Sequence, residues 1–295
     1  MSEFNSEPID IIVPWVNSND PIWKKEFDYW KEKETGNKDA CRFRDWGFIK
    51  FVLRSIEENC PWCRYVFLVL SGPSQIPDWL NVKAPKLKIV YHEDYIPKEF
   101  LPTFNSNVIE MFFSDIDELS DNFILINDDM FFCQKKNEDF YFSNNLPIVM
   151  NLTMVPSNNN NFGKTLVNTK NKSNEILGQN FSYIFSGGHL PICYNKLLHL
   201  FIKTRMDLTY FCLNKFRKNN DLTHFLFLDI QNKVKKCIFS KEPRGKLYST
   251  TKKVYIDFNI PMICINEEEN SKPNVLINIY EQLENHFNKK SSFEK

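Results

Sequence analysis

The sequence predicts an α/β fold, in which a mostly parallel, Rossmann-like or GT-A-like sheet has helices on both faces and an additional helical region follows towards the C-terminus. In the first half of the chain, short apolar strands alternate with helical segments, as in consecutive βαβ units. Residues 65–72 are almost continuously apolar, which is typical of a parallel strand covered on both faces. The apolar run 123–126 ends at Asn127-Asp128-Asp129, and open α/β sheets bind ligands at the carboxyl ends of their strands.

The expected elements of this core follow one another closely. They are a strand at 9–16, a helix at 23–30, a helix at 45–59, strands at 65–72 and 88–92, a helix at 105–113 and the strand that ends at 127–129. The turn formers Asn17-Ser-Asn-Asp-Pro21 separate the first strand from the first helix, and Pro61 ends the second helix. Phe48, Phe51 and Val52 recur at helical spacing, so one face of that helix should pack on the sheet.

The second half of the chain is predicted to contain fewer strands. Residues 157–174 are rich in Asn and other polar residues, which favours an exposed loop or a mobile lid. Residues 195–218 are predicted to be helical, and their apolar positions fit a core face as well as a membrane surface, with core packing favoured. Val275–Phe287 has the pattern of a final amphipathic helix. We therefore expect one domain, with an α/β core at 1–150, a loop or lid at 151–180 and a helical region at 181–295.

Composition excludes several classes of protein. Lys plus Arg and Asp plus Glu both number 37, so no net field attracts nucleic acid. The first eight residues are polar and acidic, unlike a signal peptide, and no apolar run is long enough to span a membrane. Eight Cys without a secretory signal indicate reduced thiols, so we expect a cytoplasmic protein. The CxxC at Cys60–Cys63 stands alone, and without a second pair a redox or zinc role is disfavoured.

The pair Asp128 and Asp129 is the strongest functional signal. Two adjacent carboxylates at the end of a buried strand are costly to desolvate unless a positive group meets them. A divalent cation at this edge of the sheet is the usual solution. The alternative is that one of the two caps a turn, for which Asp is well suited.

Four blocks of sequence carry a family resemblance. They are Ile11–Pro21; then Arg42–Asp45, Leu53–Glu57, Pro61-Trp62, Pro77–Asn81, Leu101–Ser106 and Asn127–Asp129; then Ser186–Pro191 with Arg217 and Asp221; then Cys264–Glu267 with Ser291–Glu294. Together they cover nearly the whole chain, and it resembles the Stealth family of hexose-1-phosphate transferases. That family includes bacterial capsular polysaccharide phosphotransferases and the lysosomal-enzyme GlcNAc-1-phosphotransferase. The chain departs from the family pattern at Asn17, usually Asp, at Asn107, often His, and at Glu267, more often Asp.

The resemblance implies a reaction. A sugar-1-phosphate would move from a nucleotide-sugar, with a UDP-sugar such as UDP-GlcNAc favoured, to a hydroxyl of a glycan acceptor. A phosphodiester would form and a nucleoside monophosphate would leave, in capsular or cell-surface polysaccharide synthesis. Mg²⁺, or else Mn²⁺, bound by Asp128 and Asp129 with Glu267 completing its shell, would stabilise the leaving group.

The resemblance also implies roles for other residues. Arg217 would clamp the transferred phosphoryl group, Asp221 would orient Arg217 from the same helix face, and His189 would act as general base. Gly187 and Gly188 would let the backbone approach a ligand closely. The expected donor-binding residues are Trp15, Val16, Asn17, Asp20, Arg42, Arg54 and Asn127. The expected acceptor or sugar contacts are Phe104, Asn105, Ser106 and Asn266.

Several alternatives stay open at this point. Arg54 could instead pair with Glu57 or Glu58 on its own helix, and Trp15 could be a core aromatic. A metal-dependent GT-A glycosyltransferase would also place carboxylates at a strand end but would release a nucleoside diphosphate. A non-catalytic glycan-binding protein would need no metal and turn over no donor. Weak peripheral binding to the inner face of the cytoplasmic membrane is expected, and the oligomeric state is open.

Overall fold

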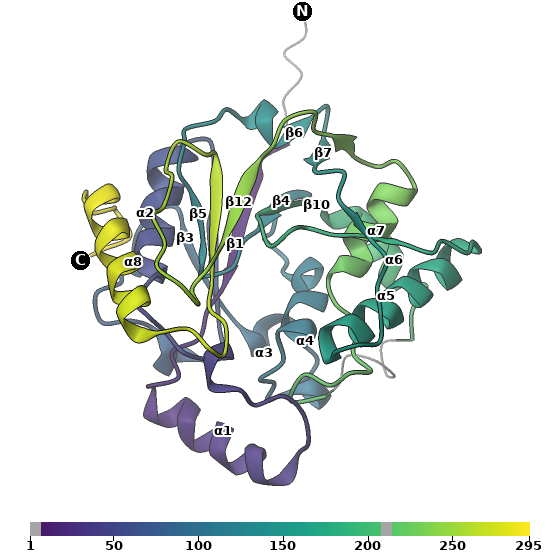
Figure 1. The fold of residues 1–295 in the computed structure, drawn as a ribbon, viewed down its shortest axis with the longest axis horizontal. Coiled ribbons are helices and arrows are strands. Elements are labelled where there is room, and N and C mark those ends of the chain that lie inside the picture. The colour runs from purple at the N-terminus through teal and green to yellow at the C-terminus, as the bar shows by residue number, and fades with distance from the viewer. Residues whose placement is uncertain (1–6, 208–213) are drawn as a thin grey trace, which may run out of the picture.

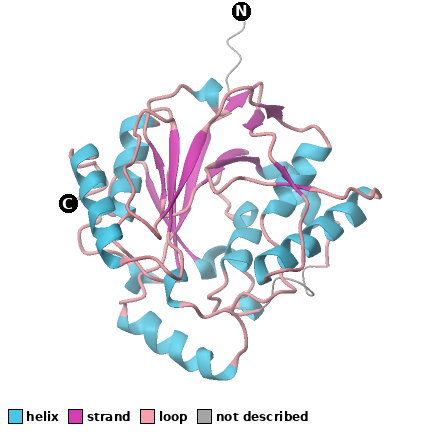
Figure 2. Ribbon diagram, viewed as in Figure 1, coloured by secondary structure: helices cyan, strands magenta, loops and turns pink. Residues whose placement is uncertain are grey.

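A five-stranded sheet forms the centre of the molecule (Figures 1 and 2). The structure is a computed structural model that describes residues 7–207 and 214–295. The strand order is β10-β4-β1-β2-β3, with bounds Ile192–Asn195, Asn122–Leu125, Ile9–Pro14, Val66–Leu70 and Leu87–Tyr91. The last four strands are mutually parallel and β10 is antiparallel to β4. The predicted mostly parallel sheet is confirmed.

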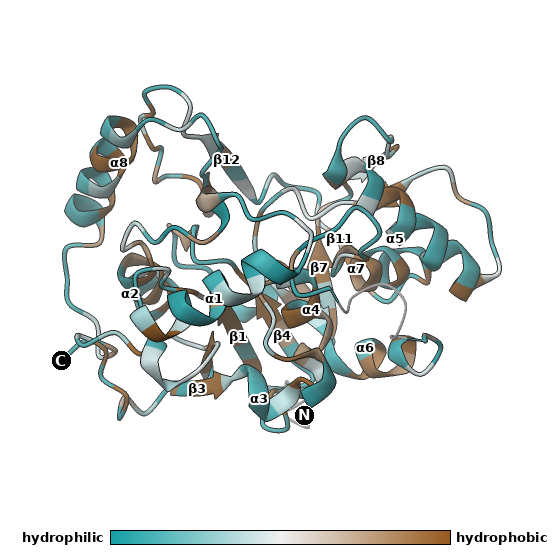
Figure 3. Cartoon of the chain, turned by 90° about the horizontal axis from the view of Figure 1, so that it is seen from below, coloured by the Kyte–Doolittle hydropathy of each residue, from teal (hydrophilic) through white to brown (hydrophobic). Residues whose placement is uncertain are grey.

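Helices cover both faces of this sheet. Successive side chains of β1 point to opposite faces, so each face contributes apolar residues to a separate core cluster. Ile11 and Val13 belong to a core cluster shared with α2 (Ile49–Asn59) and α8 (Pro273–His286), on one side of the sheet in Figure 1. Ile12 belongs to a second cluster, shared with α4 (Ser106–Met111) and α7 (Phe225–Lys233). Figure 3 shows the hydrophobic colouring of β1 and β4 between these layers.

A second sheet brings the C-terminal part of the chain to the end of β4. It has the order β12 (Gly245–Ser249), β13 (Met262–Asn266), β5 (Met130–Phe132). β13 pairs antiparallel with β5, the strand that begins directly after Asp128 and Asp129. The Ile265 N–H of β13 donates to the Asp129 carbonyl at 2.8 Å. Residues far apart in sequence therefore meet at Asp129.

Smaller elements complete the described fold. They are the helices α1 (Pro21–Lys33), α3 (His92–Tyr95), α5 (Asn161–Leu177) and α6 (Lys196–Lys203), and the short strands β6 (Phe142–Ser143), β7 (Leu146–Val149), β8 (Thr153–Met154), β9 (Ile184–Phe185) and β11 (Ile238–Phe239). The helices predicted at 23–30, 45–59, 105–113 and 275–287 are confirmed as α1, α2, α4 and α8.

The prediction of an exposed loop or lid at 157–174 was wrong for most of that stretch. α5 begins after Asn160, whose side chain accepts the Gly163 N–H at 2.7 Å, and ends at Gly178 with φ of 61°. Its buried face is formed largely by Thr165, Thr169 and other small polar residues, together with Leu166. Because the buried face of this helix is mostly polar, its apolar residues do not recur at helical spacing, and hydrophobic periodicity could not indicate the helix.

The helix predicted over 195–218 was also too long. α6 spans Lys196–Lys203, residues 208–213 lie outside the described residues, and residues 214–218 are not helical. Its core face is formed by His199 and Ile202, whereas Leu197 and Phe201 are 58% and 53% exposed, contrary to the core packing expected for them. Within the described ranges, no helix has both the length and the apolar character needed to cross a membrane.

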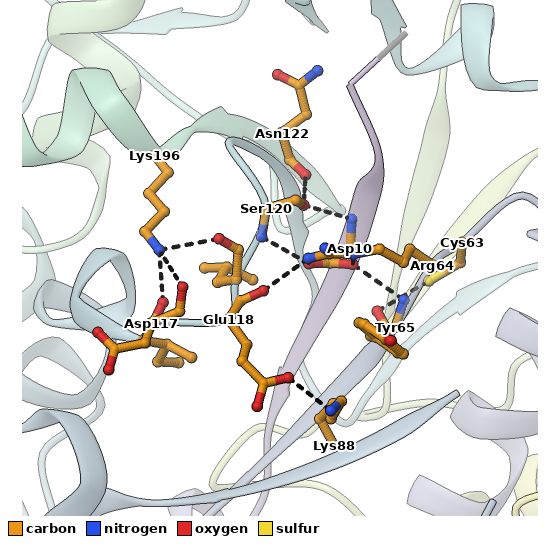
Figure 4. A network of polar contacts seen from close by, with 12 residues as sticks. Asp10, Cys63, Arg64, Tyr65, Lys88, Asp117, Glu118, Ser120, Asn122 and Lys196 are labelled. Carbon is orange, nitrogen blue, oxygen red and sulfur yellow. Dashed lines mark hydrogen bonds and ion pairs between the residues drawn. The ribbon is translucent and has the colours of Figure 1, made fainter. Parts of the chain in front are cut away.

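Asp10 ties together the amino ends of three strands, at the edge opposite the predicted site (Figure 4). Its fully buried carboxylate accepts from Arg64 Nε at 2.9 Å and Nη2 at 2.6 Å, from the Ser120 N–H at 2.7 Å and from the Tyr65 N–H at 3.1 Å. Ser120 Oγ in turn accepts the Asp10 N–H. This network joins the starts of β1, β2 and β4.

Asp10→Ala is therefore expected to lower the free energy of unfolding by about 3 kcal/mol, because it leaves Arg64 and two backbone donors without their acceptor. Urea denaturation measures the effect. Asp117→Ala, at an exposed position beside the same network, is the matched control. Equal midpoints for the two variants would contradict a structural role for Asp10.

The CxxC pair lies at the end of α2 and is buried. Cys60 and Cys63 are both free thiols. Burial raises both pKa values, that of Cys63 to about 12. A reactive cysteine needs a lowered pKa, so this pair has the properties of core residues.

Candidate active site

A cleft of 1060 Å³ opens at the carboxyl ends of the parallel strands. Residues that follow three neighbouring strands line it, with Trp15 after β1, Ser71 after β2 and Asn127 after β4. The predicted site residues that line the cleft are Trp15, Val16, Arg42, Phe104, Ser106, Asn127, Asp128, Asp129, His189, Arg217, Asn266 and Glu267. Most of the predicted site is thus brought together by the fold.

The acidic pair lies in a tight turn between β4 and β5, where the Met130 N–H donates to the Asn127 carbonyl at 3.1 Å. Burial and the neighbouring charges of Asp129 and Asp45 raise the pKa of Asp128 well above its usual range. Burial also raises the pKa of Asp129, to about 6. Asp45 ends one of the blocks that carry the family resemblance, without an expected role; it lines the cleft, and its carboxylate accepts the Gly47 N–H at 2.8 Å. Three carboxyl groups therefore lie close together on this side of the cleft, and each is costly to ionise without a positive partner.

The carboxylate pair fits a hard divalent cation. Asp129 Oδ1 is buried without a hydrogen-bond partner, and neither Asp128 nor Asp129 forms an ion pair with a Lys or Arg among the described residues. Mg²⁺ is commonly held by one or two carboxylates, with substrate phosphate and water supplying the remaining oxygens. The donor set therefore suits a cation that arrives with a phosphorylated substrate.

Glu267 lies at the cleft but its oxygens are occupied. Oε1 accepts from Arg44 Nη1 at 2.6 Å and Oε2 from Trp46 Nε1 at 2.8 Å. In the described parts of the chain, no group of three His, Cys, Asp or Glu side chains is arranged to hold a metal. Glu267 thus joins the 40–47 segment to the end of β13, and it is not gathered with the acidic pair.

Arg217 brings positive charge to the same cleft. Its Nη2 donates to Ser106 Oγ, and its carbonyl accepts the Asn37 N–H at 2.8 Å. Desolvation and the nearby Arg42 lower its pKa, although Glu110 and Asp221 act in the opposite direction. No carboxylate of the described residues lies within ion-pair distance of its guanidinium. A cleft arginine without a close anionic partner is well suited to bind a phosphate.

His189 lies on the loop between β9 and β10, exposed to the cleft, with φ of 51°. Desolvation and the charge of Arg217 lower its pKa, so the neutral imidazole can accept a proton at neutral pH. A Cβ on Gly187 would lie 2.3 Å from Ile192 Cδ1, and one on Gly188 would lie 2.9 Å from Leu152 Cδ1. The two glycines therefore permit close packing within the protein, which differs from the expected approach of backbone to ligand.

Two cleft residues behind Arg217 were missed by the sequence analysis. Glu110 is buried, with a pKa raised to about 7 by desolvation, and its Oε2 lies 3.8 Å from His224 Nε2. His224 Nδ1 is 2.8 Å from the Tyr194 hydroxyl, and burial lowers the pKa of His224 to about 3. Glu110 follows Ser106 by one helical turn, and this spacing was the signal that could have indicated it.

Glu110→Gln is expected to remove one cause of the decrease in the free energy of unfolding as the pH rises from 5 to 8. The folded pKa of Glu110 lies above its ordinary value, so its carboxyl favours folding below about pH 4.5, and that contribution is lost as the pH rises through about 7. The glutamine variant should therefore become more stable relative to wild type, by about 1–3 kcal/mol between pH 5 and pH 8. Urea titrations at both pH values measure this difference, and a constant difference would show that Glu110 titrates normally.

Asp221 does not orient Arg217 from a shared helix face, because neither residue is helical. Its fully buried carboxylate accepts from Asn105 Nδ2 and Asn214 Nδ2, both at 2.7 Å, and from the Lys218 N–H at 3.1 Å. Asn105 in turn caps α4 by accepting the Asn107 N–H. Asp221 and Asn105 therefore fix the loop that carries Arg217 and lie behind the cleft wall.

Three expected donor-binding residues lie outside the cleft lining. Arg54 donates to both carboxylate oxygens of Glu294, at 2.8 and 2.7 Å, so its partner is neither a phosphate nor Glu57 or Glu58. Asp20 caps α1, accepting the N–H two residues on at 3.0 Å. The Asn17 N–H donates to Gln75 Oε1 at 2.6 Å. Asp20 and Asn17 thus shape the loop that holds Trp15 at the cleft.

The fold and the cleft define the class of protein. An α/β sheet whose carboxyl edge presents buried carboxylates, an arginine without a carboxylate partner and a neutral imidazole has the groups that a group-transfer enzyme needs.

Comparison with known proteins then gives the family. Residues 42–149 match the sequence model of Stealth protein conserved region 2. The chain is 32% identical over 340 residues to the capsular polysaccharide phosphotransferase WcwK of Streptococcus pneumoniae, covering 99% of both chains. It is 30% identical to the exopolysaccharide phosphotransferase cps2G of Lactiplantibacillus plantarum, covering 99% of this chain and 98% of that protein. The chain belongs to the Stealth family, and it is an enzyme that transfers a sugar phosphate.

Proposed function

We propose that this enzyme transfers a sugar-1-phosphate from a nucleotide-sugar, with a UDP-sugar as the favoured donor, to a hydroxyl of a glycan acceptor. A phosphodiester forms and a nucleoside monophosphate is released. The relatives named as capsular polysaccharide and exopolysaccharide phosphotransferases support a role in capsular or cell-surface polysaccharide synthesis.

Arg217 is the observation that carries this proposal. Its guanidinium lies in the cleft, is held by the neutral Ser106 hydroxyl and has no carboxylate at ion-pair distance among the described residues. The same cleft contains a carboxylate pair suited to a cation. A diphosphate-linked donor supplies phosphate oxygens to the arginine and to a cation on the carboxylates at once.

The proposed reaction is a single displacement at the phosphorus atom that carries the sugar. The acceptor oxygen forms a bond to the phosphorus that carries the sugar, and the bond from that phosphorus to the bridging oxygen breaks. The acceptor proton passes to the His189 imidazole, and Arg217 holds the transferred phosphoryl oxygens. Asp128 and Asp129 would hold Mg²⁺ or Mn²⁺, which neutralises charge on the leaving phosphate when bound. The nearby Glu110 acts against the lowering of the Arg217 pKa and so favours the charged guanidinium.

Other residues of the cleft lining are candidates for donor and acceptor contacts. Trp15 is 6% exposed and belongs to the core cluster shared with α2, which is the alternative expected for it, so it supports the cleft wall beside Val16 and leaves little ring surface for a base. Arg42 is exposed in the cleft, close enough to Arg217 to lower the pKa of that guanidinium, and can bind the second phosphate. Phe104, Ser106 and Asn266 also line the cleft and are proposed to contact the sugar or the acceptor.

The product distinguishes this reaction from that of a GT-A glycosyltransferase. The enzyme is incubated with UDP- and GDP-sugars and a glycan acceptor, and the nucleotide released is identified by chromatography, with acceptor-free reactions as the control. We expect acceptor-dependent release of a nucleoside monophosphate. Release of a nucleoside diphosphate would show cleavage at the anomeric carbon and would overturn the proposal.

We propose that the enzyme binds the inner face of the cytoplasmic membrane weakly and peripherally. Leu197 and Phe201 expose apolar surface on α6, whereas Lys196 and Lys203 are engaged with carbonyl groups and with Asp115. Two exposed apolar side chains bind a membrane only marginally. We expect washing with buffer or salt, without detergent, to release any membrane-bound enzyme, as measured by immunoblot of washed membranes, and a requirement for detergent would contradict this.

A further inference from the structure

Arg244 is a buried arginine that the proposed reaction does not use. It is 3% exposed, and its Nη2 has no hydrogen-bond partner. The structure gives it no ion pair with any described carboxylate. Arg54 and Arg64, by contrast, each donate two hydrogen bonds to one carboxylate. A charged side chain in this setting needs a partner, because desolvating an unpaired charge is costly.

Aromatic rings supply part of the compensation. Arg244 Cζ lies 4.1 Å from the centroid of the Phe140 ring and 5.6 Å from that of Tyr141. Such contacts favour the cation but accept none of its N–H groups. Burial lowers the pKa of Arg244, yet a guanidinium stays protonated in proteins. A negative partner is therefore still missing.

A small cavity of 20 Å³ adjoins Arg244. Ser186 lines it, and the Ser186 hydroxyl accepts the Gly188 N–H at 3.2 Å and has no acceptor for its own proton among the described residues. Cys193 also lines the cavity, and no carboxylate does. The volume is about that needed for one water-sized occupant. A pocket of this size, lined by a cation and a hydroxyl donor, selects a single small anion.

We propose that Arg244 and Ser186 form a binding site for one monatomic anion of the size of chloride. The anion neutralises the guanidinium and accepts hydrogen bonds from both side chains. The cavity lies behind the loop that carries His189, because Ser186, Gly187 and Pro191 line the cavity and His189 lines the active-site cleft. The bound anion therefore also stabilises the base of that loop.

Thermal unfolding of the full chain tests this site. The melting temperature is measured in sodium chloride, sodium bromide and sodium gluconate at equal ionic strength, since gluconate is too large for the cavity. We expect the halides to raise Tm by about 2–3 °C for each tenfold excess over their Kd, and gluconate to have no such effect. Arg244→Met should remove the difference between the salts, because it keeps an unbranched apolar stem on Phe140 and removes the charge.

Arg205→Met is the matched control, since it removes one exposed positive charge that lines neither this cavity nor the active-site cleft, and it should keep the halide effect. Equal Tm values in halide and gluconate for wild type, or an unchanged halide effect in Arg244→Met, would overturn the proposal. Crystals grown in bromide provide a second measurement. An anomalous peak beside Arg244 Nη2 would support the site, and density of a water molecule without anomalous signal would overturn it.

Discussion

Asp128→Asn and Asp129→Asn are each expected to reduce turnover by about 10³-fold or more, because each removes half of the carboxylate pair proposed to hold the cation. The fold should persist. Burial and neighbouring carboxylates raise the pKa of Asp128 in the folded protein, so its ionised form opposes folding near neutral pH. A neutral asparagine relieves that cost, and Asp128→Asn should unfold at a temperature at least as high as that of the metal-free wild type.

Two measurements separate loss of metal from loss of structure. Addition of Mg²⁺ should raise the Tm of wild type and leave that of both variants unchanged. Asp139→Asn, at an exposed position outside the cleft lining, is the control for removal of one negative charge. Undiminished activity of the wild-type enzyme in excess chelator would remove the metal from the proposed mechanism.

His189→Ala and Arg217→Lys should fail in different ways. His189→Ala should lower kcat by about 10²–10⁴-fold with nearly unchanged donor affinity, since the base contacts only the acceptor. Burial and Arg217 lower the pKa of His189, so the wild-type base is already neutral at pH 7. The rate deficit of the alanine variant should therefore shrink at higher pH, where the acceptor hydroxyl ionises more readily.

Arg217→Lys keeps the charge but loses the planar fork that binds two phosphate oxygens. We expect weaker donor binding together with a slower single-turnover rate. Donor affinity by calorimetry and rapid-quench rates for both variants decide between the roles. Near-native turnover of His189→Ala would exclude His189 as the base and favour Glu110, whose pKa of about 7 and position beside Arg217 suit that role.

The sequence predicted the parts of the site that depend on local pattern. Asp128 and Asp129 follow an apolar strand, and the carboxyl ends of parallel strands meet at one edge, so their position in the cleft followed from topology. Glu110 and His224 could not be predicted in this way. Each is a single polar residue in an ordinary-looking segment, and contacts far along the chain give it its environment.

Secondary structure was mispredicted in two segments where polar side chains are buried or form hydrogen bonds to the backbone. α5 buries Thr and Ser along one face, so its period is invisible to hydropathy. Residues 214–218 were predicted to be helical, but the Asn214 side chain and the Lys218 N–H bond to the Asp221 carboxylate instead of forming helical turns. Such amide–carboxylate networks depend on precise geometry that sequence spacing does not contain.

The pairing of Arg54 with Glu294 has a consequence for biosynthesis. The two residues are 240 positions apart, so at ribosomal speed the carboxylate is made about 10–50 s after the arginine. During that interval the guanidinium of Arg54 on α2 has no carboxylate partner, and the contact between α2 and α8 has not yet formed. The nascent sheet can assemble early, whereas the outer layer on this face closes only after translation of the last helix. Nascent chains stalled before residue 287 should therefore recruit chaperones at this surface.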